Sequence, residues 1–261
     1  MNEQGLSSLK GKKGLIVGIA NQHSIAWGCA KVLHAAGADI AVTYLNQKAE
    51  PYVRPLAETI HAPIIAPLDM SDDSQLNDLF GVITQQWGTL DFVIHAIAFA
   101  PLADLHGRVT DSSRDGFLKA MDISCHSFIR VAHMAEPLMA KQGGSLLTLS
   151  YYGAEKVVEH YGIMGLCKAA LESSVKYLAA ELGDKKIRVN ALSPGPIATR
   201  AASGIEAFEH LISHAIEKAP EHSAINIEQV GHFARFLVSD ESQLVTGGTY
   251  FIDAGLNIMA A

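Results

Sequence analysis

Cysteines and long apolar runs are both scarce in this sequence. Its 261 residues include three cysteines, Cys29, Cys125 and Cys167, which are too far apart for a metal-binding Cys-x-x-Cys pair and odd in number for a disulfide framework. No run of about 18 apolar residues is long enough to cross a bilayer. The first ten residues also lack the apolar stretch of a secretory signal. We therefore expect a cytoplasmic protein with no membrane association.

Other absences exclude classes of function. The formal net charge is 20 − 27 = −7, which argues against a nucleic-acid partner held by bulk electrostatics. There is no Gly-x-Ser-x-Gly motif, so an α/β-hydrolase would have no nucleophile. His210 and His214 have the spacing of a metal pair, but no third ligand lies near them in the sequence, and we expect no metal.

Short apolar runs alternate with helical patterns from Lys13 onward. Such alternation predicts parallel strands joined by helical crossovers, and strands that are apolar throughout predict helices on both faces of the sheet. We expect one doubly wound α/β domain of the Rossmann-like type over residues 1–261, with residues 194–220 as a helical lid over the substrate. The predicted strands are 14–19, 39–44, 64–68, 90–98, 144–150, 187–192 and 249–252, and the predicted helices are 25–36, 73–87, 113–140, one through 171–182, and 228–238.

The turn after the first predicted strand has the ingredients of a phosphate site. Gly18 frees the turn, Ser24 is placed to cap the next helix, and Gly28 allows helix and strand to approach closely. The start of that helix would present backbone N–H groups to a pyrophosphate. The middle glycine of the usual dinucleotide fingerprint is absent, so a plain strand–turn–helix corner is the alternative.

The choice of cofactor rests on the ends of the second and third strands. Tyr44-Leu45-Asn46 offers neither a carboxylate for a ribose hydroxyl nor an arginine for a 2′-phosphate; the nearest cations are Lys48 and Arg54. NADH is therefore favoured over NADPH. Asp69 and Met70 either flank the adenine, or Asp69 caps the following helix.

Two Tyr–Lys pairs compete for the catalytic role. Tyr161 and Lys168 are seven residues apart, nearly two helical turns, so both side chains would leave one face, where the cation would lower the phenol pKa. A chance surface pair is the alternative. Tyr152 and Lys156 spell Tyr-x-x-x-Lys, the spacing of ordinary short-chain dehydrogenases, but in a segment beside Gly153 that we expect to be a loop. We favour Tyr161 and Lys168.

Several motifs resemble one family. They are Gly18-x5-Ser24-Ile-Ala-x-Gly28, His95-Ala-Ile-Ala-Phe-Ala-Pro101, Leu147-Thr-Leu-Ser-Tyr151, Tyr161-x6-Lys168 and Arg188-Val-Asn-Ala-Leu-Ser-Pro-Gly-Pro-Ile197. Together the chain resembles the bacterial NADH-dependent enoyl-acyl-carrier-protein reductases, which are divergent short-chain dehydrogenase/reductases. The resemblance implies reduction of a trans-2-enoyl thioester by NADH in fatty acid elongation, an acyl carrier protein as partner, and a homotetramer.

The resemblance also implies roles for individual residues. Tyr161 would hydrogen-bond the thioester oxygen, Lys168 would hold the nicotinamide ribose, and Tyr151 would orient the substrate. The dinucleotide would lie against Gly18, Ser24, Ile25, Leu45, Asp69, Met70, Ile97, Lys168, Ile197, Ala198 and Thr199. The acyl chain would lie against Ala100, Tyr151, Met164, Pro196, Ile205 and Phe208.

The sequence departs from the family in two informative places. Leu45 replaces a usual glutamine, which puts one adenine contact in doubt. The lid carries Glu206, Glu209 and His210 where the family has basic residues, so an acidic carrier would meet like charge. The chain would then dock a carrier through Lys185, Lys186, Arg200 or Arg235, or would use a coenzyme A thioester. Two rival functions are a carbonyl reductase that uses Tyr152 and Lys156, and an NAD-sensing scaffold without turnover.

Overall fold

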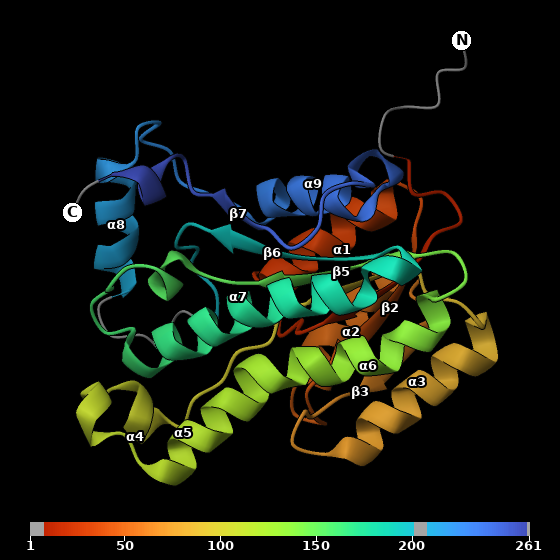
Figure 1. Ribbon diagram of the computed structural model, residues 1–261, viewed down its shortest axis with the longest axis horizontal. Helices are drawn as coiled ribbons and strands as arrows, with labels where there is room; N and C mark the ends of the chain where they lie inside the picture. Colours follow the sequence, from red (N-terminus) through yellow and green to blue (C-terminus); the bar gives the residue numbers. More distant parts are fainter. Residues whose placement is uncertain (1–7, 201–207, 260–261) are drawn as a thin grey trace.

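A seven-stranded parallel sheet forms the centre of the molecule, with strand order β3-β2-β1-β4-β5-β6-β7 (Figure 1). The computed structural model describes residues 8–200 and 208–259. The strands are β1 (Lys13–Val17), β2 (Asp39–Tyr44), β3 (Ile64–Pro67), β4 (Phe92–His95), β5 (Gly144–Leu149), β6 (Ile187–Pro194) and β7 (Thr249–Ile252). The predicted doubly wound α/β fold is confirmed, because the crossovers run in opposite directions on the two sides of β1 and β4.

Helices cover both faces of the sheet. One apolar core lies under α1, α2 and α9, and a second lies under α3, α6 and α7 (Figure 1). The helices are α1 (Ile25–Ala35), α2 (Glu50–Thr59), α3 (Asp73–Trp87), α4 (Leu102–Leu105), α5 (Arg114–Met121), α6 (Ser127–Met139), α7 (Gly162–Leu182), α8 (Phe208–Lys218) and α9 (Ile227–Val238). Among the described residues, none of these helices is long and apolar enough to span a membrane.

The main differences from the predicted elements lie in the helices and in one strand. α2 is not among the predicted helices; its prolines Pro51 and Pro55 are typical helix breakers, but Pro51 lies in the first turn, where a proline is tolerated. The predicted helix 113–140 is interrupted by a π-helical turn, η2 (Asp122–His126), between α5 and α6. The predicted strand 90–98 pairs only over β4, and its exit leaves the sheet.

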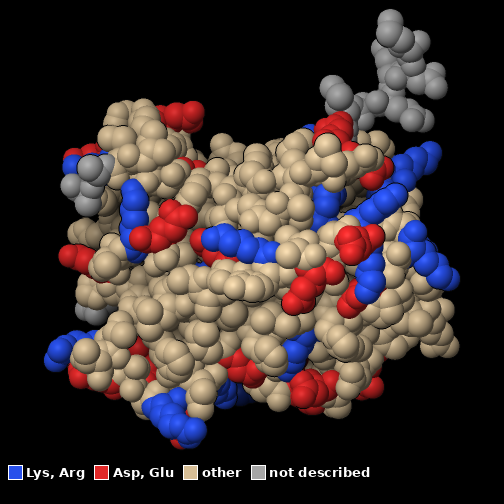
Figure 2. Space-filling view, in the orientation of Figure 1, with Lys and Arg blue, Asp and Glu red and all other residues tan. Residues whose placement is uncertain are grey.

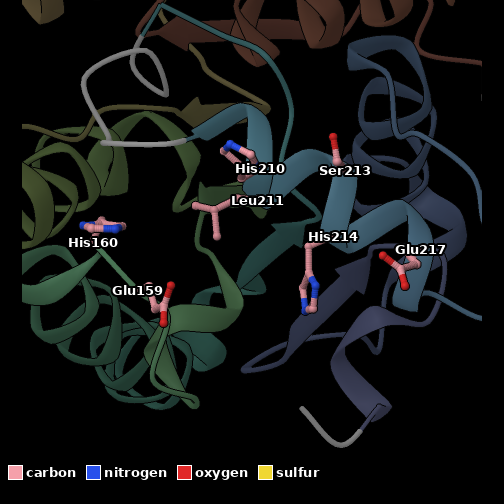
Figure 3. Close-up of a pocket in the computed structure, with 7 residues that line it drawn as sticks. All are labelled: Glu159, His160, His210, Leu211, Ser213, His214 and Glu217. Atoms are coloured by element: carbon pink, nitrogen blue, oxygen red, sulfur yellow. The ribbon is translucent and has the colours of Figure 1, made fainter.

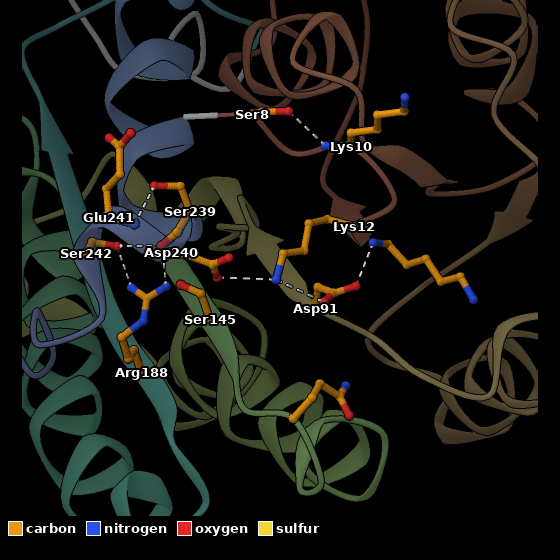
Figure 4. Close-up of polar contacts among 12 residues, drawn as sticks. Ser8, Lys10, Lys12, Asp91, Ser145, Arg188, Ser239, Asp240, Glu241 and Ser242 are labelled. Atoms are coloured by element: carbon orange, nitrogen blue, oxygen red, sulfur yellow. Dashed lines mark hydrogen bonds and ion pairs between the residues drawn. The ribbon is translucent and has the colours of Figure 1, made fainter. Parts of the chain in front are cut away.

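The amino edge of the sheet is tied together by polar contacts (Figure 4). The Lys12 ammonium lies 3.6 Å from Asp91 Oδ1 and 3.2 Å from Asp240 Oδ1. The Arg188 guanidinium, at the start of β6, donates to the Ser242 hydroxyl at 2.8 Å. These contacts join the starts of the strands to the residues that follow α9, so this edge is a structural one.

The face of the molecule in Figure 2 carries acidic and basic side chains interspersed with one another. The fields of neighbouring opposite charges largely cancel at a distance. Physiological salt also screens exposed charges beyond about 8 Å, so this face has no strong field of one sign. The carboxyl edge of the sheet lies opposite the amino edge that Lys12, Asp91 and Arg188 tie together. In folds of this kind, ligands bind at the carboxyl edge, at the switch point of the strand order.

Candidate functional site

The direction of the crossovers reverses between β1 and β4, and in doubly wound folds the ligand crevice lies at the carboxyl ends of the two strands at such a switch point. Gly18 follows β1 with φ at +106°, and a Cβ built on it would lie 2.2 Å from the carbonyl oxygen of Ala96, which follows β4. The backbone N–H of Ala96 in turn donates to Val17 O at 2.9 Å. Only glycine allows the two backbones to approach this closely.

Ser24 occupies the predicted position at the start of α1, but its predicted capping bond is wrong. Its hydroxyl instead accepts from the N–H groups of Ala20 and Asn21 at 3.0 and 3.1 Å and so fixes the turn after β1. Ser24 therefore leaves the first-turn N–H groups of α1, where Ile25 stands, without a side-chain cap from within the turn. A helix start in this state suits a pyrophosphate, because its N–H groups and the helix dipole both favour an anion.

Gly28 has a different role from the predicted one. A Cβ on Gly28 would lie 2.3 Å from the carbonyl oxygen of Ile227, the first residue of α9. Gly28 therefore allows α1 to approach α9, rather than the strand, and it stabilises this corner of the site by close packing.

The ends of β2 and β3 bring three of the predicted cofactor residues to the same edge. Leu45 is 52% exposed directly after β2. Met70 is buried, and its carbonyl accepts from Arg130 Nη2 at 2.7 Å. The capping alternative for Asp69 is wrong, because Asp72 is the residue whose side chain caps α3, by accepting from Ser74 N at 2.9 Å.

Tyr161 and Lys168 are both buried near the start of α7. Tyr161 is the N-cap residue of the helix, and its ring meets that of Tyr151 with centroids 4.8 Å apart at 64°. The Lys168 ammonium donates to the carbonyl of Leu149, the last residue of β5, at 2.6 Å. Two phenols and an ammonium ion therefore gather where β5 ends, which excludes the alternative of a chance surface pair.

Burial sets the pKa values of these groups. Burial raises the pKa of Tyr161 well above its usual value, and Cys167 adds to the rise, so the prediction that Lys168 lowers it is wrong. Burial lowers the pKa of Lys168 to about 8, against opposing contributions from Cys167 and Glu172. At neutral pH, Tyr161 is a neutral phenol that can donate a hydrogen bond or a proton, and Lys168 is mainly an ammonium ion.

Tyr152 stays beside the site, with its ring centroid 4.8 Å from that of Tyr151, whereas Lys156 is held elsewhere. Tyr152 begins the short 3-10 helix η3 (Tyr152–Ala154), and the Lys156 ammonium donates to the backbone carbonyls of Asn257 and, at 3.3 Å, Met259. This lysine therefore anchors the C-terminal segment. The geometry does not support its pairing with Tyr152 for catalysis.

Three of the six predicted acyl-chain residues lie in one cluster with Tyr161. Ala100, Met164, Tyr151 and Tyr161 belong to one apolar cluster at the carboxyl edge, against which Leu211 of α8 packs. Of the other predicted acyl-chain residues, Pro196 is buried after β6, Phe208 begins α8, and Ile205 lies outside the described residues. Of the other predicted cofactor residues, Ile197 and Thr199 are half-buried and Ala198 is exposed. Ile97 packs against the core under α3 and α6.

A pocket of about 390 Å³ lies beside this cluster, between α8 and the segment before α7 (Figure 3). Its lining consists of Glu159, His160, His210, Leu211, Ser213, His214 and Glu217. Figure 3 shows the rings of His210 and His214 directed apart on successive turns of α8. Over residues 8–200 and 208–259, no group of three His, Cys, Asp or Glu side chains could hold a metal ion.

Sequence patterns missed the polar groups beneath the site. His95 at the end of β4 is fully buried, and its pKa is lowered to about 3 by burial and by Lys168. Ser127 donates its hydroxyl proton to Ile123 O at 2.6 Å, so His95 Nε2 is the donor in their 2.8 Å hydrogen bond, while Nδ1 faces Thr148 Oγ1 at 3.0 Å. A histidine in an otherwise apolar strand was the available signal.

The chain is similar to known proteins over nearly all of its length. Residues 18–257 match the family model described as Enoyl-(Acyl carrier protein) reductase. A protein of Rhizobium meliloti named enoyl-[acyl-carrier-protein] reductase [NADH] 1 is 47% identical over 97% of this chain and 92% of its own length. A protein of Rickettsia typhi named as an NADH enoyl-[acyl-carrier-protein] reductase is 45% identical over 97% of both chains.

Two solved structures share the fold over nearly their full length. The enoyl-(acyl-carrier-protein) reductase of Anaplasma phagocytophilum in complex with NAD has a TM-score of 0.93 at 47% identity, with 98% of this chain and 97% of that chain covered. The Bacillus cereus enoyl-acyl carrier protein reductase with NADP+ and an indole naphthyridinone has a TM-score of 0.95 at 44% identity, with 98% and 100% covered.

Proposed function

This chain belongs to the family of enoyl-(acyl carrier protein) reductases, and we propose that it reduces the trans-2 double bond of an enoyl thioester with NADH in fatty acid elongation. The observation that carries the proposal is the neutral phenol of Tyr161, buried at the start of α7 with its ring against Tyr151. It lies at the carboxyl edge of the sheet, within an apolar cluster that suits an acyl chain.

The residues of the site divide the chemical work. NADH, when bound, supplies the hydride that reaches the β-carbon of the enoyl thioester. The Tyr161 hydroxyl donates a hydrogen bond to the thioester oxygen, where negative charge develops. Lys168 donates to the nicotinamide ribose and keeps the local potential positive. Tyr151, in contact with Tyr161, orients the thioester.

The dinucleotide lies across the crevice of the sheet. The uncapped start of α1, with Gly18, Ser24 and Ile25, takes the pyrophosphate. Leu45, Asp69 and Met70 surround the adenine. Ile97, Ile197, Ala198 and Thr199 lie beside the nicotinamide, together with Lys168. The close approach of Gly18 to Ala96 supports this fit, because it brings the turn after β1 against the segment that follows β4.

The preference for NADH over NADPH rests on the cations near β2. The Arg54 guanidinium is held by Glu50, with Nε at 2.8 Å from Oε1, one turn away in α2. A 2′-phosphate would therefore have to compete with Glu50 for this guanidinium. The neutral side chain of Leu45 offers no replacement.

The segment 194–220 acts as a lid on the acyl chain. Its described helix α8 begins with Phe208 and packs Leu211 against the cluster of Tyr151 and Tyr161. Phe208, Ala100, Met164 and Pro196 provide the apolar lining, and each buried methylene contributes about 0.8 kcal/mol. Ile205, proposed for the same lining, lies outside the described residues.

The topology narrows the cations that could meet an acyl carrier protein. Lys185 and Lys186 immediately precede β6, and Arg235 lies in the last turn of α9, so all three are near the amino edge, away from the site. Arg200 follows β6 on the carboxyl side. We therefore assign the carrier contact to Arg200. A coenzyme A thioester is the alternative, since the acidic Glu209 disfavours an acidic carrier protein.

Exposed apolar side chains and the state of the cysteines support a homotetramer in the cytoplasm. Leu118 of α5, Ile129 of α6, and Leu166 and Tyr177 of α7 are exposed apolar side chains, which a homotetramer would cover. Light scattering should give a mass four times that of one chain, and a monomer would contradict this. Cys29, Cys125 and Cys167 are free and buried, which fits a reducing cytoplasm.

The direct test is to follow NADH oxidation with crotonyl-carrier protein, crotonyl-coenzyme A and a panel of small ketones. We expect turnover of the thioesters, with the carrier thioester favoured in kcat/KM. Equal efficiency on both thioesters would remove the carrier-specific part of the proposal. Turnover of ketones alone would indicate a carbonyl reductase, and NADH binding without any turnover would indicate a sensing scaffold.

A further inference from the structure

Two buried side chains of α7 hold the exit of β5. Lys168 and Glu172 are four residues apart, about one helical turn, and both are buried. The Lys168 ammonium donates to Leu149 O at 2.6 Å, and the Ser150 hydroxyl donates to Glu172 Oε1 at 2.5 Å. One face of α7 therefore fixes two consecutive residues at the end of the strand.

The next residue along the chain is Tyr151. Ser150 is fixed on both sides, because its N–H donates to Leu192 O at 2.6 Å while its hydroxyl is bound by Glu172. Tyr151 then places its ring 4.8 Å from the ring of Tyr161. The bond between Ser150 and Glu172 therefore holds the residue directly before Tyr151.

The neighbours of Lys168 show which group supports its charge. Cys167 on α7, Cys125 on η2 and His95 on β4 all face the ammonium ion. Burial raises the pKa of Cys167 to about 11 and also raises the pKa of Cys125, while the pKa of His95 falls to about 3, so these three groups are neutral near pH 7. Glu172 supplies the negative charge, and it raises the pKa of Lys168 against the effect of burial.

Glu172 has its own set of neighbours. Burial and Glu155 raise the pKa of its carboxyl group, whereas the Ser150 hydroxyl, Lys176 and Lys168 favour the charged form. A buried charge costs free energy that an apolar residue of similar volume would not. A carboxylate kept in this position is therefore more consistent with a task at the site than with stability alone.

We propose that Glu172 is a positioning residue: its carboxylate lies one helical turn from Lys168 in the same buried site, where it balances the lysine charge, and through the Ser150 hydroxyl it fixes the backbone that carries Tyr151. The inference rests on the roles proposed above for Lys168 and Tyr151. It adds to them a residue that contacts neither cofactor nor substrate in that scheme.

The test of the charge measures NADH binding by fluorescence from pH 6 to pH 10 with Glu172→Gln and Glu172→Leu. The ammonium form of Lys168 is present below its pKa and lost above it, so removing the carboxylate should move the pH at which binding weakens down by about one unit. Binding at pH 6 should equal that of the parent, and binding at pH 8 should be about fivefold weaker.

Matched variants separate charge from shape. Glu181→Gln removes the same charge from an exposed position of the same helix and should leave the profile unchanged. Glu172→Asp keeps the charge and should retain the parent profile. A parent-like profile in both neutral variants, or a Glu172→Asp profile shifted as far as theirs, would overturn the charge role. Having two neutral variants covers the case in which one of them fails to fold.

The link to Tyr151 is tested with Ser150→Ala, which keeps the carboxylate. We expect kcat for the enoyl thioester to fall about tenfold, while NADH binding at pH 8 weakens much less than in Glu172→Gln because the carboxyl group is still present. A parent-level kcat would refute the Ser150 link. The NADH-binding measurement needs no turnover. A protein that shows the predicted shift in the pH profile of NADH binding but reduces no thioester would contradict the proposed function. The role of Glu172 toward Lys168 would still stand.

Discussion

At the scale of single residues, burial decides which groups at the site are charged. Tyr161 loses water around its phenolate form, so its pKa rises and the phenol stays protonated. Lys168 loses water around its ammonium form, so its pKa falls to about 8. The two shifts have opposite signs for the same reason, and at neutral pH they leave Tyr161 a proton donor and Lys168 mainly a cation.

Replacing the Tyr161 hydroxyl tests its role as the donor to the thioester oxygen. Tyr161→Phe should lower kcat by about 10²–10³, because the developing charge loses its hydrogen bond, while NADH binding stays near the parent value. Steady-state kinetics and NADH fluorescence measure the two quantities. Tyr177→Phe is the matched control, since Tyr177 is 71% exposed on the same helix; an equal loss there, or parent-level kcat in Tyr161→Phe, would exclude the role.

Gly18→Ala tests the close approach of β1 and β4. The new Cβ would lie 2.2 Å from Ala96 O, and the positive φ alone costs about 1–2 kcal/mol, so the variant should melt at lower temperature and bind NADH more weakly. Gly81→Ala is the control, because a Cβ there meets nothing within 4 Å on α3 and should stabilise by about 0.5–1 kcal/mol. Equal melting temperatures for the two variants would argue against the constraint at Gly18.

At the scale of elements, the π-helical turn η2 aligns the long helix with the exit of β4. The Ser124 hydroxyl accepts from Phe99 N and donates to Phe99 O, both at 2.8 Å. Ser127, just after the turn, is the partner of His95. Through Ser124, the turn fixes the segment from Ile97 to Ala100. We propose that this segment lies beside both the nicotinamide and the acyl chain.

Ser124→Ala tests the two hydrogen bonds between Ser124 and Phe99. It leaves both backbone groups of Phe99 without the hydroxyl, so the free energy of unfolding should fall by about 1–3 kcal/mol, and KM for NADH should rise more than kcat falls. Urea denaturation and steady-state kinetics measure these effects. Ser173→Ala, at an exposed position of α7, should change neither quantity; a Ser124→Ala enzyme with parent KM would show that the segment is fixed by other contacts.

At the scale of the whole molecule, the sheet separates a structural edge from a functional one. The amino edge carries the contacts of Lys12, Asp91 and Arg188, whereas the carboxyl edge carries the phenols and the crevice. The parallel arrangement forces this separation, because every strand end of one kind lies on the same side.

The position of Arg200 on the carboxyl side gives a test of the carrier contact. Arg200→Ala should lower kcat/KM for crotonyl-carrier protein severalfold and leave that for crotonyl-coenzyme A unchanged, because removing a cation slows encounter with an acidic partner. Lys186→Ala, at the opposite edge, should affect neither substrate. An equal loss of kcat/KM for both substrates would contradict the carrier contact and would indicate that Arg200 supports the structure of the lid.

The sequence alone predicted the seven strands, their parallel arrangement, and the position of Tyr161 and Lys168 near the start of a helix that follows the fifth strand. These follow from short-range patterns: apolar runs, helical spacing and the chain order of strand and helix. Helix α2 escaped prediction because Pro51 and Pro55 argue locally against a helix.

Only the tertiary structure decided the chemistry between distant parts of the chain. Four contacts appear only once the chain has folded. They are the hydrogen bond between Ser124 and Phe99, the bond by which Ser24 fixes the turn after β1, the contact of Gly28 with α9, and the hydrogen bond from Ser150 to Glu172. The sign of the Tyr161 pKa shift belongs to the same group. Spacing along a helix determines which side chains share a face, but the amount of water excluded around them depends on every element packed against that face.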